Sequence, residues 1–418
     1  MVLVLFQSAV SIADTHYVGR LGTAPLAGLA LVFPFVVMMQ MLSAGAVGGG
    51  VSSAIARALG AGDQARAESL LAHAVLLGVG LGLIFAVLML LIGPPLYRLL
   101  GGAGAPFGYA MTYSVILFAG APLVWVANFC AAALRGQGNT LLPAIVMSGA
   151  ALVHIPLTAW LTQRFGIAGT AWAHVIGYAA AMIAMLVLLA RGAGKLRLHL
   201  RGRRWERRNF SEILGVGLLS SVSAIQTVLA ALILTGVVAR FGVDALAGYG
   251  VGVRLELMMV PLTFAVGAAL VPLTGMHVGA GQHARAKCIA WAGAGLGAVI
   301  AALIGLTVAL APHLWMDLFT QDAKVHATGS AYLRTVGPFY VCVGVAVALY
   351  FASQGSRRVG WPVLAGTARL VIAAGGGWLA AHLGAGLDVV FMCIAAGLVA
   401  WAVMTMLAVK LVSWQQGE

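Results

Sequence analysis

Asp14 is the acidic residue best placed for chemistry, because it lies within the first long apolar run of the chain. It stands in SIADTHYVGRLG, in an expected helix 2–18, about four residues before the end of that helix. At about 1.5 Å of rise per residue, its depth is about 6 Å. A buried carboxylate is costly when ionised, so we expect Asp14 to bind a proton or a cation. The alternative is a local structural pairing with His16 or Arg20 near the helix end.

Arg254 and Glu256 form a second polar cluster, in VGVRLELMMVP of the apolar run 246–275. Residues two apart on a helix do not face each other, so each needs a partner elsewhere. The pair could shape a binding cavity, or it could serve in structural ion pairs. Asn128 and His154 are further cavity candidates, although such residues more often hydrogen-bond between membrane helices. The same caution applies to the other polar residues within apolar runs: Gln40, His174 and Gln226.

The composition identifies the class of protein that carries these residues. Hydrophobic residues make up 62% of the chain and charged residues 8%, and the mean hydropathy is +1.01. Apolar runs of about 20 residues recur, which is the length that crosses a bilayer as a helix. The net charge of +13 does not indicate nucleic-acid binding, because the basic residues lie in short loops. We therefore predict an all-α integral membrane protein, with no nucleic-acid partner.

Twelve spans are predicted, six on each side of a basic linker at 191–211. The linker region holds eight of the 24 Lys and Arg residues. The predicted domains are a six-helix bundle at 1–190 and a second at 212–418. The spans are placed at 2–18, 26–50, 69–93, 109–133, 140–161, 168–190, 212–239, 246–275, 287–311, 327–353, 360–382 and 387–413.

The two halves resemble each other at a shift of about 219 residues. LGAGDQARAE at 59–68 matches VGAGQHARAK at 278–287, and RLGTAPLAG from Arg20 matches RFGVDALAG from Arg240. Such order and spacing indicate an internal duplication. A shift of 220, the one that matches Arg20 with Arg240, places Leu234 opposite Asp14, so this acid belongs to the first half alone.

Basic residues between the spans predict the orientation of the chain. Sixteen fall on one side and five on the other, which places both termini and the linker in the cytoplasm. The opening apolar run lacks a small-residue cleavage site, so we expect it to be retained as a helix. Six spans per half give parallel repeats, which suit a transporter that rocks one bundle against the other.

Other classes of function find no motif in this chain. The sequence has neither GxxxxGK[ST] nor HExxH, so an ATP-driven pump or a hydrolytic enzyme lacks support. The four cysteines are scattered without a CxxC pair, and we read them as buried thiols. No cofactor or metal is expected beyond a coupling H+ or Na+.

Four motifs, taken in order, resemble those of the multidrug and toxic compound extrusion (MATE) family, in its DinF-like branch. They are DTHYVGRLGTAPLAGLA, GGGVSSAIARALGAGDQARA, LRGQGNTLLP and GYGVGVRLELMMVPLTFAVGAALVPLTGMHVGAG. The likeness begins at about Leu5 and covers nearly the whole chain.

The resemblance implies an antiporter with a V-shaped pair of six-helix bundles in the bacterial cytoplasmic membrane. Such a protein expels amphipathic, often cationic, compounds in exchange for H+ or Na+, and Asp14 matches its ion-coupling acid. The fifth span departs from the family pattern, with Ala151 and Ile155 in place of Asn and Asp, which leaves Asp14 without those partners. The seventh span has no interior acid, since Glu212 lies at its edge. These departures favour H+ over Na+.

The main alternative is a flippase for lipid-linked sugars, from the same superfamily. Flippases tend to have more spans and an arginine-rich cavity, whereas only Arg254, Arg334 and Arg369 fall inside the predicted spans here. A non-transporting receptor or scaffold is a third possibility. The expected partners are small-molecule substrates and membrane lipid. We expect a monomer, because both repeats lie in one chain.

Overall fold

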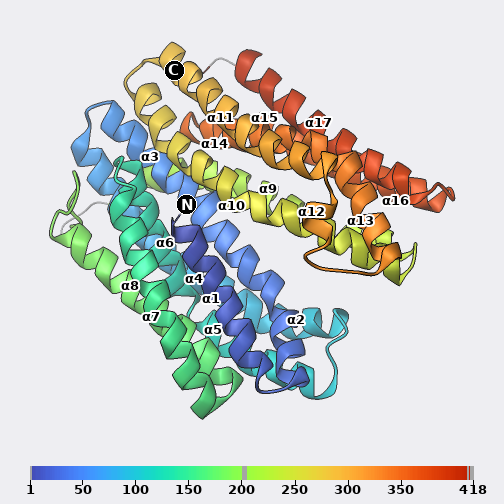
Figure 1. The fold of residues 1–418 in the computed structure, drawn as a ribbon. Helices are drawn as coiled ribbons and strands as arrows, with labels where there is room; N and C mark the ends of the chain where they lie inside the picture. The colour runs from blue at the N-terminus through green and yellow to red at the C-terminus, as the bar shows by residue number, and fades with distance from the viewer. Residues whose placement is uncertain (1, 200–204, 412–413, 415–418) are drawn as a thin grey trace. The chain divides into compact units, whose positions relative to one another are not determined.

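The computed structural model describes residues 2–199, 205–411 and 414, except for the side chains of 2–8, 257, 260 and 261. Two compact units divide the chain, Met1–Gly217 and Leu218–Glu418. Each unit is a bundle of long helices, from blue to green in the first and from yellow to red in the second (Figure 1).

The helices of the first unit follow the predicted spans closely. They are α1 (Val2–Gly19), α2 (Thr23–Gln40), a π-helical segment (Met41–Val47), α3 (Gly48–Gly60), α4 (Gln64–Leu99), α5 (Gly104–Ala119), α6 (Ala121–Gly136), α7 (Leu141–Phe165) and α8 (Ile167–Ala190).

The second unit repeats this pattern with more interruptions. Its helices are α9 (Arg207–Ala239), α10 (Val243–Gly279), α11 (His283–Leu310), α12 (His313–Met316), α13 (Ala323–Val336), a 3-10 turn (Gly337–Phe339), α14 (Tyr340–Gly355), α15 (Gly360–Leu370), a π-helical segment (Val371–Gly375), α16 (Gly376–His382) and α17 (Leu387–Leu411).

All twelve predicted spans coincide with helices, so the prediction of an all-α membrane fold is confirmed. Within the described residues, length and hydropathy alone select ten spans, or eleven if α5 and α6 form one span bent by 48°. Helix α1 carries the remaining predicted span.

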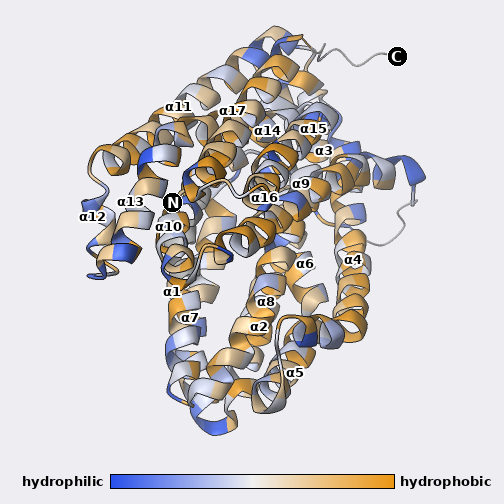
Figure 2. Cartoon of the chain, turned by 90° about the vertical axis from the view of Figure 1, so that its right-hand side faces the viewer, coloured by the Kyte–Doolittle hydropathy of each residue, from blue (hydrophilic) through white to orange (hydrophobic). Residues whose placement is uncertain are grey.

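The outer surface of both bundles is apolar, as a lipid-facing protein requires. Leu91 in the first unit and Leu303 in the second are 70% and 66% exposed. Figure 2 shows apolar residues along the lengths of the helices and polar residues concentrated towards their ends. A hydrocarbon environment explains such surfaces, because water would penalise them.

The duplication is visible in the backbone turns. Gly62 and Gly281, at matching repeat positions, have φ angles of 75° and 74°. Gly22 and Gly242, also at matching positions, have φ angles of 123° and 107°. L-residues rarely adopt such angles, so glycine is required at the same turns in both halves.

The boundary between the units differs from the predicted one. Helix α9 begins at Arg207, inside the predicted linker 191–211, and the first unit extends to Gly217 rather than 190. Glu212 supplies the physical reason, because its carboxylate pairs with Arg57 at 3.0 Å and Arg66 at 2.6 Å. These ion pairs attach the start of α9 to the first unit. Part of the predicted linker, 200–204, lies outside the described residues.

Candidate functional site

Asp14 lies on α1, is only 5% exposed, and faces polar side chains of α7 and α8. Its Oδ1 atom lies 2.8 Å from His154 Nε2 and accepts a hydrogen bond from Thr158 Oγ1 at 3.2 Å. Its Oδ2 atom lies 3.4 Å from His174 Nδ1. The carboxylate thus ties three helices of the first unit together.

Helical spacing explains how α7 presents two of these groups. His154 and Thr158 are four residues apart, so they share one face of the helix, and Thr158 Oγ1 lies 3.0 Å from His154 Nε2. His174 on α8 packs edge-on against His154, with ring centroids 4.8 Å apart. The three side chains therefore surround the carboxylate from two neighbouring helices.

A chain of polar groups continues from this site through α8, α2 and α6. The Tyr178 ring lies 5.9 Å from the His174 ring, and the Tyr178 hydroxyl accepts a hydrogen bond from Gln40 Nε2 at 2.6 Å. Asn128 Nδ2 donates to Gln40 Oε1 at 3.1 Å and to Ser43 Oγ at 2.8 Å. The network thus reaches the π-helical segment Met41–Val47, a geometry often found at functional sites.

The partners of Asp14 differ from those of the family pattern. Ala151 and Ile155 of the fifth span replace the polar residues of that pattern, so we expected Asp14 to lack those particular partners. The structure shows that His154, one residue before Ile155, supplies a partner at 2.8 Å. His174, a weaker candidate from its sequence, lies 3.4 Å from the other oxygen of the same carboxylate. The available signal was the i, i+4 spacing of His154 and Thr158 on one face of a membrane helix.

The structure does not show the alternative for Asp14, a local pairing with His16 or Arg20 near the end of its helix. His16, which is exposed, stacks edge-on with Tyr17, with ring centroids 5.3 Å apart. The polar contacts of Asp14 come instead from α7 and α8, about 140 or more positions along the chain. Its site is a tertiary one.

Asp14, His154 and His174 also form a group that could hold a metal ion, since one ligand atom from each lies within 4.8 Å of the others. Carboxylate and imidazole groups can bind either protons or transition metals. In this structure the group is joined by direct contacts between its own side chains.

The second polar cluster lies in the second unit, where Glu256 is held by two partners. Its Oε1 pairs with Arg369 Nη2 at 3.1 Å, and its Oε2 accepts a hydrogen bond from Tyr332 at 3.3 Å. Arg254 is exposed, with its guanidinium 5.7 Å from the centre of the Phe319 ring. Arg254 and Glu256 therefore find separate partners, as their spacing predicted. Glu256 takes part in a structural ion pair.

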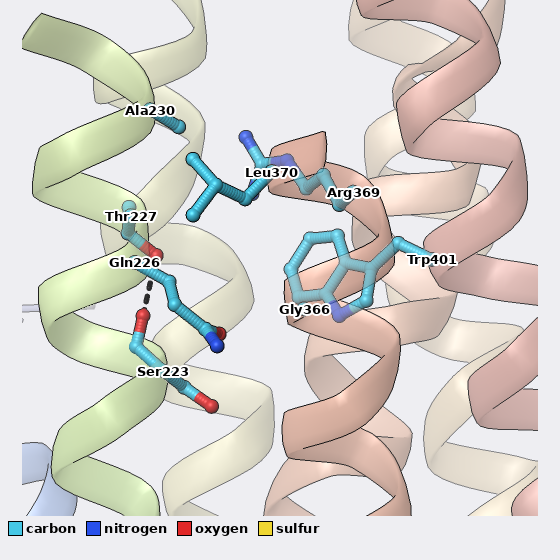
Figure 3. Close-up of a pocket in the computed structure, with 8 residues that line it drawn as sticks. All are labelled: Ser223, Gln226, Thr227, Ala230, Gly366, Arg369, Leu370 and Trp401. Carbon is cyan, nitrogen blue, oxygen red and sulfur yellow. Dashed lines mark hydrogen bonds between the residues drawn. The ribbon is translucent and has the colours of Figure 1, made fainter. Parts of the chain in front are cut away.

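A pocket lies beside Arg369, between α9, α15 and α17 (Figure 3). The empty volume of the pocket is about 290 Å³ when the open space in front of it is included. The Arg369 guanidinium lies over the indole of Trp401, 4.8 Å from the ring centre. The lining residues are Ser223, Gln226, Thr227, Ala230, Gly366, Arg369, Leu370 and Trp401.

The repeated helical bundles and the buried polar groups in each define a polytopic membrane protein of the transporter class. The family model described as MatE matches residues 1–160 and 220–379, well over half of the 418 residues. The chain belongs to the MatE family.

Two relatives show the range of proteins that this chain resembles. It is 26% identical to the FAD transporter of Shewanella oneidensis over 371 residues, or 87% of this chain and 81% of that protein. It is 24% identical to the probable multidrug resistance protein NorM of Thermotoga maritima over 368 residues, or 86% of this chain and 78% of that protein.

Solved structures share the fold. A MOP superfamily transporter from Pyrococcus furiosus superposes with a TM-score of 0.91 at 24% identity, covering 98% of this chain and 93% of that one. A MATE structure in a bent conformation gives a TM-score of 0.92 at 24% identity, covering 98% and 92%.

Proposed function

We propose that the protein is an ion-coupled antiporter that exports amphipathic organic compounds, often cationic ones, across the bacterial cytoplasmic membrane. Its motifs favour the DinF-like branch of the family, and both termini are proposed to lie in the cytoplasm. The observation that carries the proposal is the buried Asp14 carboxylate, which is paired with side chains from two other helices. Titratable groups at membrane depth are costly, and in transporters they serve ion pathways.

The ligand chemistry around Asp14 favours H+ over Na+. Hard cations are bound by oxygen atoms, whereas two of the groups around this carboxylate are imidazoles. Imidazoles exchange protons near neutral pH. Thr158 adds one hydroxyl oxygen, but the pairing with His154 uses the same carboxylate oxygen.

The proposed mechanism is exchange by alternating access. A proton arriving from outside neutralises Asp14 and weakens its contact with His154, which loosens α1 against α7. The substrate leaves in that state, and release of the proton to the cytoplasm restores the contact. Each ligand shifts the equilibrium only by its different affinity for the two states, so the gradient supplies the free energy.

The relatives of this chain carry names that point to different substrates. The Thermotoga maritima relative is named for multidrug resistance, and the Shewanella oneidensis relative is named a FAD transporter. The pocket beside Trp401 offers an aromatic face together with polar groups from Gln226 and Ser223.

The experiment is dye efflux from sealed liposomes that contain the purified protein, with a pH gradient and a Na+ gradient imposed separately. We expect the pH gradient alone to drive efflux, and Asp14→Asn to reduce it to the protein-free level. Asp317→Asn is a matched control, because Asp317 forms an exposed pair with His326 at 3.0 Å. Unchanged pH-driven efflux in Asp14→Asn would rule out its coupling role.

The flippase alternative predicts a different result. Neither gradient would move the dye, and a lipid-linked pyrophosphate would bind the protein in detergent. In the structure, Arg369 is already engaged by Glu256 and Arg254 is exposed, which disfavours a shared pyrophosphate site.

A further inference from the structure

The group formed by Asp14, His154 and His174 has the ligand chemistry of a transition-metal site. One ligand atom from each residue, a carboxylate oxygen or an imidazole nitrogen, lies within 4.8 Å of the others. Such a mixed set of nitrogen and oxygen ligands is typical of Zn2+ and its neighbours among the first-row metals. Ca2+ and Mg2+ instead prefer sites built from oxygen atoms.

The distances within the group are close to those that a bound metal requires. Zn2+ holds four ligands in a tetrahedron at about 2.0–2.2 Å, so neighbouring ligand atoms lie about 3.3–3.6 Å apart. Asp14 Oδ2 and His174 Nδ1 are 3.4 Å apart. Asp14 Oδ1 and His154 Nε2 are 2.8 Å apart, the separation of a hydrogen bond. This second pair opens by about half an ångström when a metal replaces the proton between its atoms.

One ligand atom of the group makes no hydrogen bond. His174 Nδ1 is shielded from solvent and has no hydrogen-bond partner within the described part of the chain. Buried polar atoms are nearly always paired, so an unpaired imidazole nitrogen beside a carboxylate points to a ligand that it binds. Because this nitrogen holds no hydrogen bond, the ring can turn towards His154 without breaking one.

Three packed helices hold the group in place. Asp14 lies on α1, His154 on α7 and His174 on α8, and each of these helices contacts the other two. Thr158 Oγ1 lies 3.2 Å from Asp14 Oδ1 and 3.0 Å from His154 Nε2. Its hydroxyl can therefore hydrogen-bond a water molecule that serves as the fourth ligand of a metal.

The charge of Asp14 is available to a cation. Among the described residues, its ionic partners are the two histidines, and no lysine or arginine pairs with it. Two neutral imidazoles and one carboxylate offset one of the two charges of a divalent metal. A buried ion requires such compensation, because burial without it is costly.

We propose that Asp14, His154 and His174 bind a divalent transition metal, with Zn2+ as the ion that fits their chemistry best. The metal takes the place of the proton between Asp14 and His154, and that proton passes to water. A metal bound by all three side chains ties α1 to α7 and α8. Zn2+ therefore inhibits export, a consequence that rests on the proposed coupling role of Asp14.

The test uses Co2+ as a spectroscopic substitute for Zn2+. The purified full-length protein is titrated in detergent, after removal of any polyhistidine tag. Tetrahedral Co2+ absorbs visible light much more strongly than hydrated, octahedral Co2+, so binding is followed directly. We expect one tetrahedral Co2+ per chain, displaced by Zn2+ but not by Mg2+ or Na+.

Histidine variants locate the bound metal. His174→Gln and His154→Gln should each weaken Co2+ binding by at least about 100-fold, because loss of even an outer-shell partner costs about 10–100-fold. His326→Gln is the matched control, since its Nε2 also lies 3.0 Å from a carboxylate, that of Asp317, in an exposed pair. Thermal unfolding of the metal-free variants checks that they are folded. Unchanged Co2+ binding in His174→Gln would overturn the proposal.

A measurement on the wild-type protein alone identifies the ligands. X-ray absorption of the Zn2+ complex should show two imidazoles among nitrogen and oxygen neighbours at about 2.0–2.2 Å. A sulfur neighbour at about 2.3 Å would assign the metal to a cysteine and overturn the proposal. Absence of tetrahedral Co2+ in the titration would overturn it as well.

Efflux from liposomes separates this inference from the export proposal. Zn2+ should inhibit dye efflux driven by a pH gradient through the wild-type protein. Zn2+ bound by the three residues without inhibition would keep the metal site and contradict the coupling role of Asp14. Loss of efflux in Asp14→Asn, with no metal bound by wild type, would keep the coupling role and overturn the metal site.

Discussion

Helices α1, α7 and α8 of the first unit correspond through the duplication to α9, α15 and α17 of the second, yet only the first set has a buried carboxylate at its centre. A shift of 220 residues places Leu234 at the position of Asp14, and a shift of 219 places Ala373 and Cys393 at those of His154 and His174. Leu234 and Ala373 are buried and apolar. One scaffold thus carries an ionisable site in one copy and plain packing in the other.

The second unit places its polar groups elsewhere on the same helices. Gln226, Arg369 and Trp401 lie on α9, α15 and α17 and line a pocket. A π-helical segment, Val371–Gly375, begins two residues after Arg369, and Met41–Val47 begins directly after Gln40 in the first unit. We infer that duplication supplied two equivalent bundles, and that their buried polar groups then diverged.

The largest effect on stability is expected where buried charge is shared in the first unit. Glu212→Ala would leave Arg57, whose side chain is 4% exposed, without its carboxylate, at a cost of about 3–5 kcal/mol. Glu256→Ala in the second unit should cost less, since the side chains of Arg369 and Glu256 are 19% and 16% exposed. Thermal unfolding in detergent measures both. Equal losses of stability in the two variants would show that the difference in burial does not determine how much each ion pair contributes.

The histidines of the first unit should differ in their effect on transport. His154→Ala removes the 2.8 Å contact to Asp14, and a hydrogen bond to a charged group is worth about 1.5–3 kcal/mol. We expect a larger loss of pH-driven efflux than for His174→Ala, whose nitrogen lies 3.4 Å away. His326→Ala, at an exposed pair, is the control. A larger loss in His174→Ala would instead make that imidazole the principal partner.

Close helix packing offers a comparison between matching glycines. A Cβ at Gly297 would lie 2.6 Å from the Gly344 carbonyl oxygen, and one at Gly78 would lie 3.1 Å from Val126 Cα. Overpacking of this kind costs about 1–3 kcal/mol, so Gly297→Ala should lower the unfolding temperature more than Gly78→Ala. Gly80→Ala, where nothing lies within 4 Å, should have little effect. A drop for Gly80→Ala as large as for Gly78→Ala would point to helix propensity or lipid contact instead.

The smallest effect is expected at a helix start. Asp63 caps α4, its Oδ1 accepting a hydrogen bond from the backbone N–H of Arg66 at 2.9 Å. Its repeat counterpart Gln282 makes no side-chain cap to α11. Asp63→Ala should therefore cost about 1 kcal/mol, and Gln282→Ala close to nothing. Thermal unfolding of both variants in detergent measures the difference. Equal losses of stability would show that the Asp63 cap does not stabilise α4 more than Gln282 stabilises α11.

The sequence by itself determined the membrane class, the twelve helical spans, the duplication and the position of Asp14 within an apolar helix. Each of these depends on local or periodic signals: apolar length, matching blocks such as 59–68 and 278–287, and an acid within the first apolar run. Burial of apolar residues in lipid and hydrogen bonding within each helix make such signals sufficient.

Only the tertiary structure decided which residues surround each polar group. His154 and His174 come from helices distant in sequence from Asp14, and Glu212 joins the first unit although it begins the second run of spans. Gln226 meets Thr367 at 2.7 Å only because α9 packs beside α15. The physical reason is that a side chain's partners depend on how helices rotate and pack against one another, and periodicity along one helix does not contain that information.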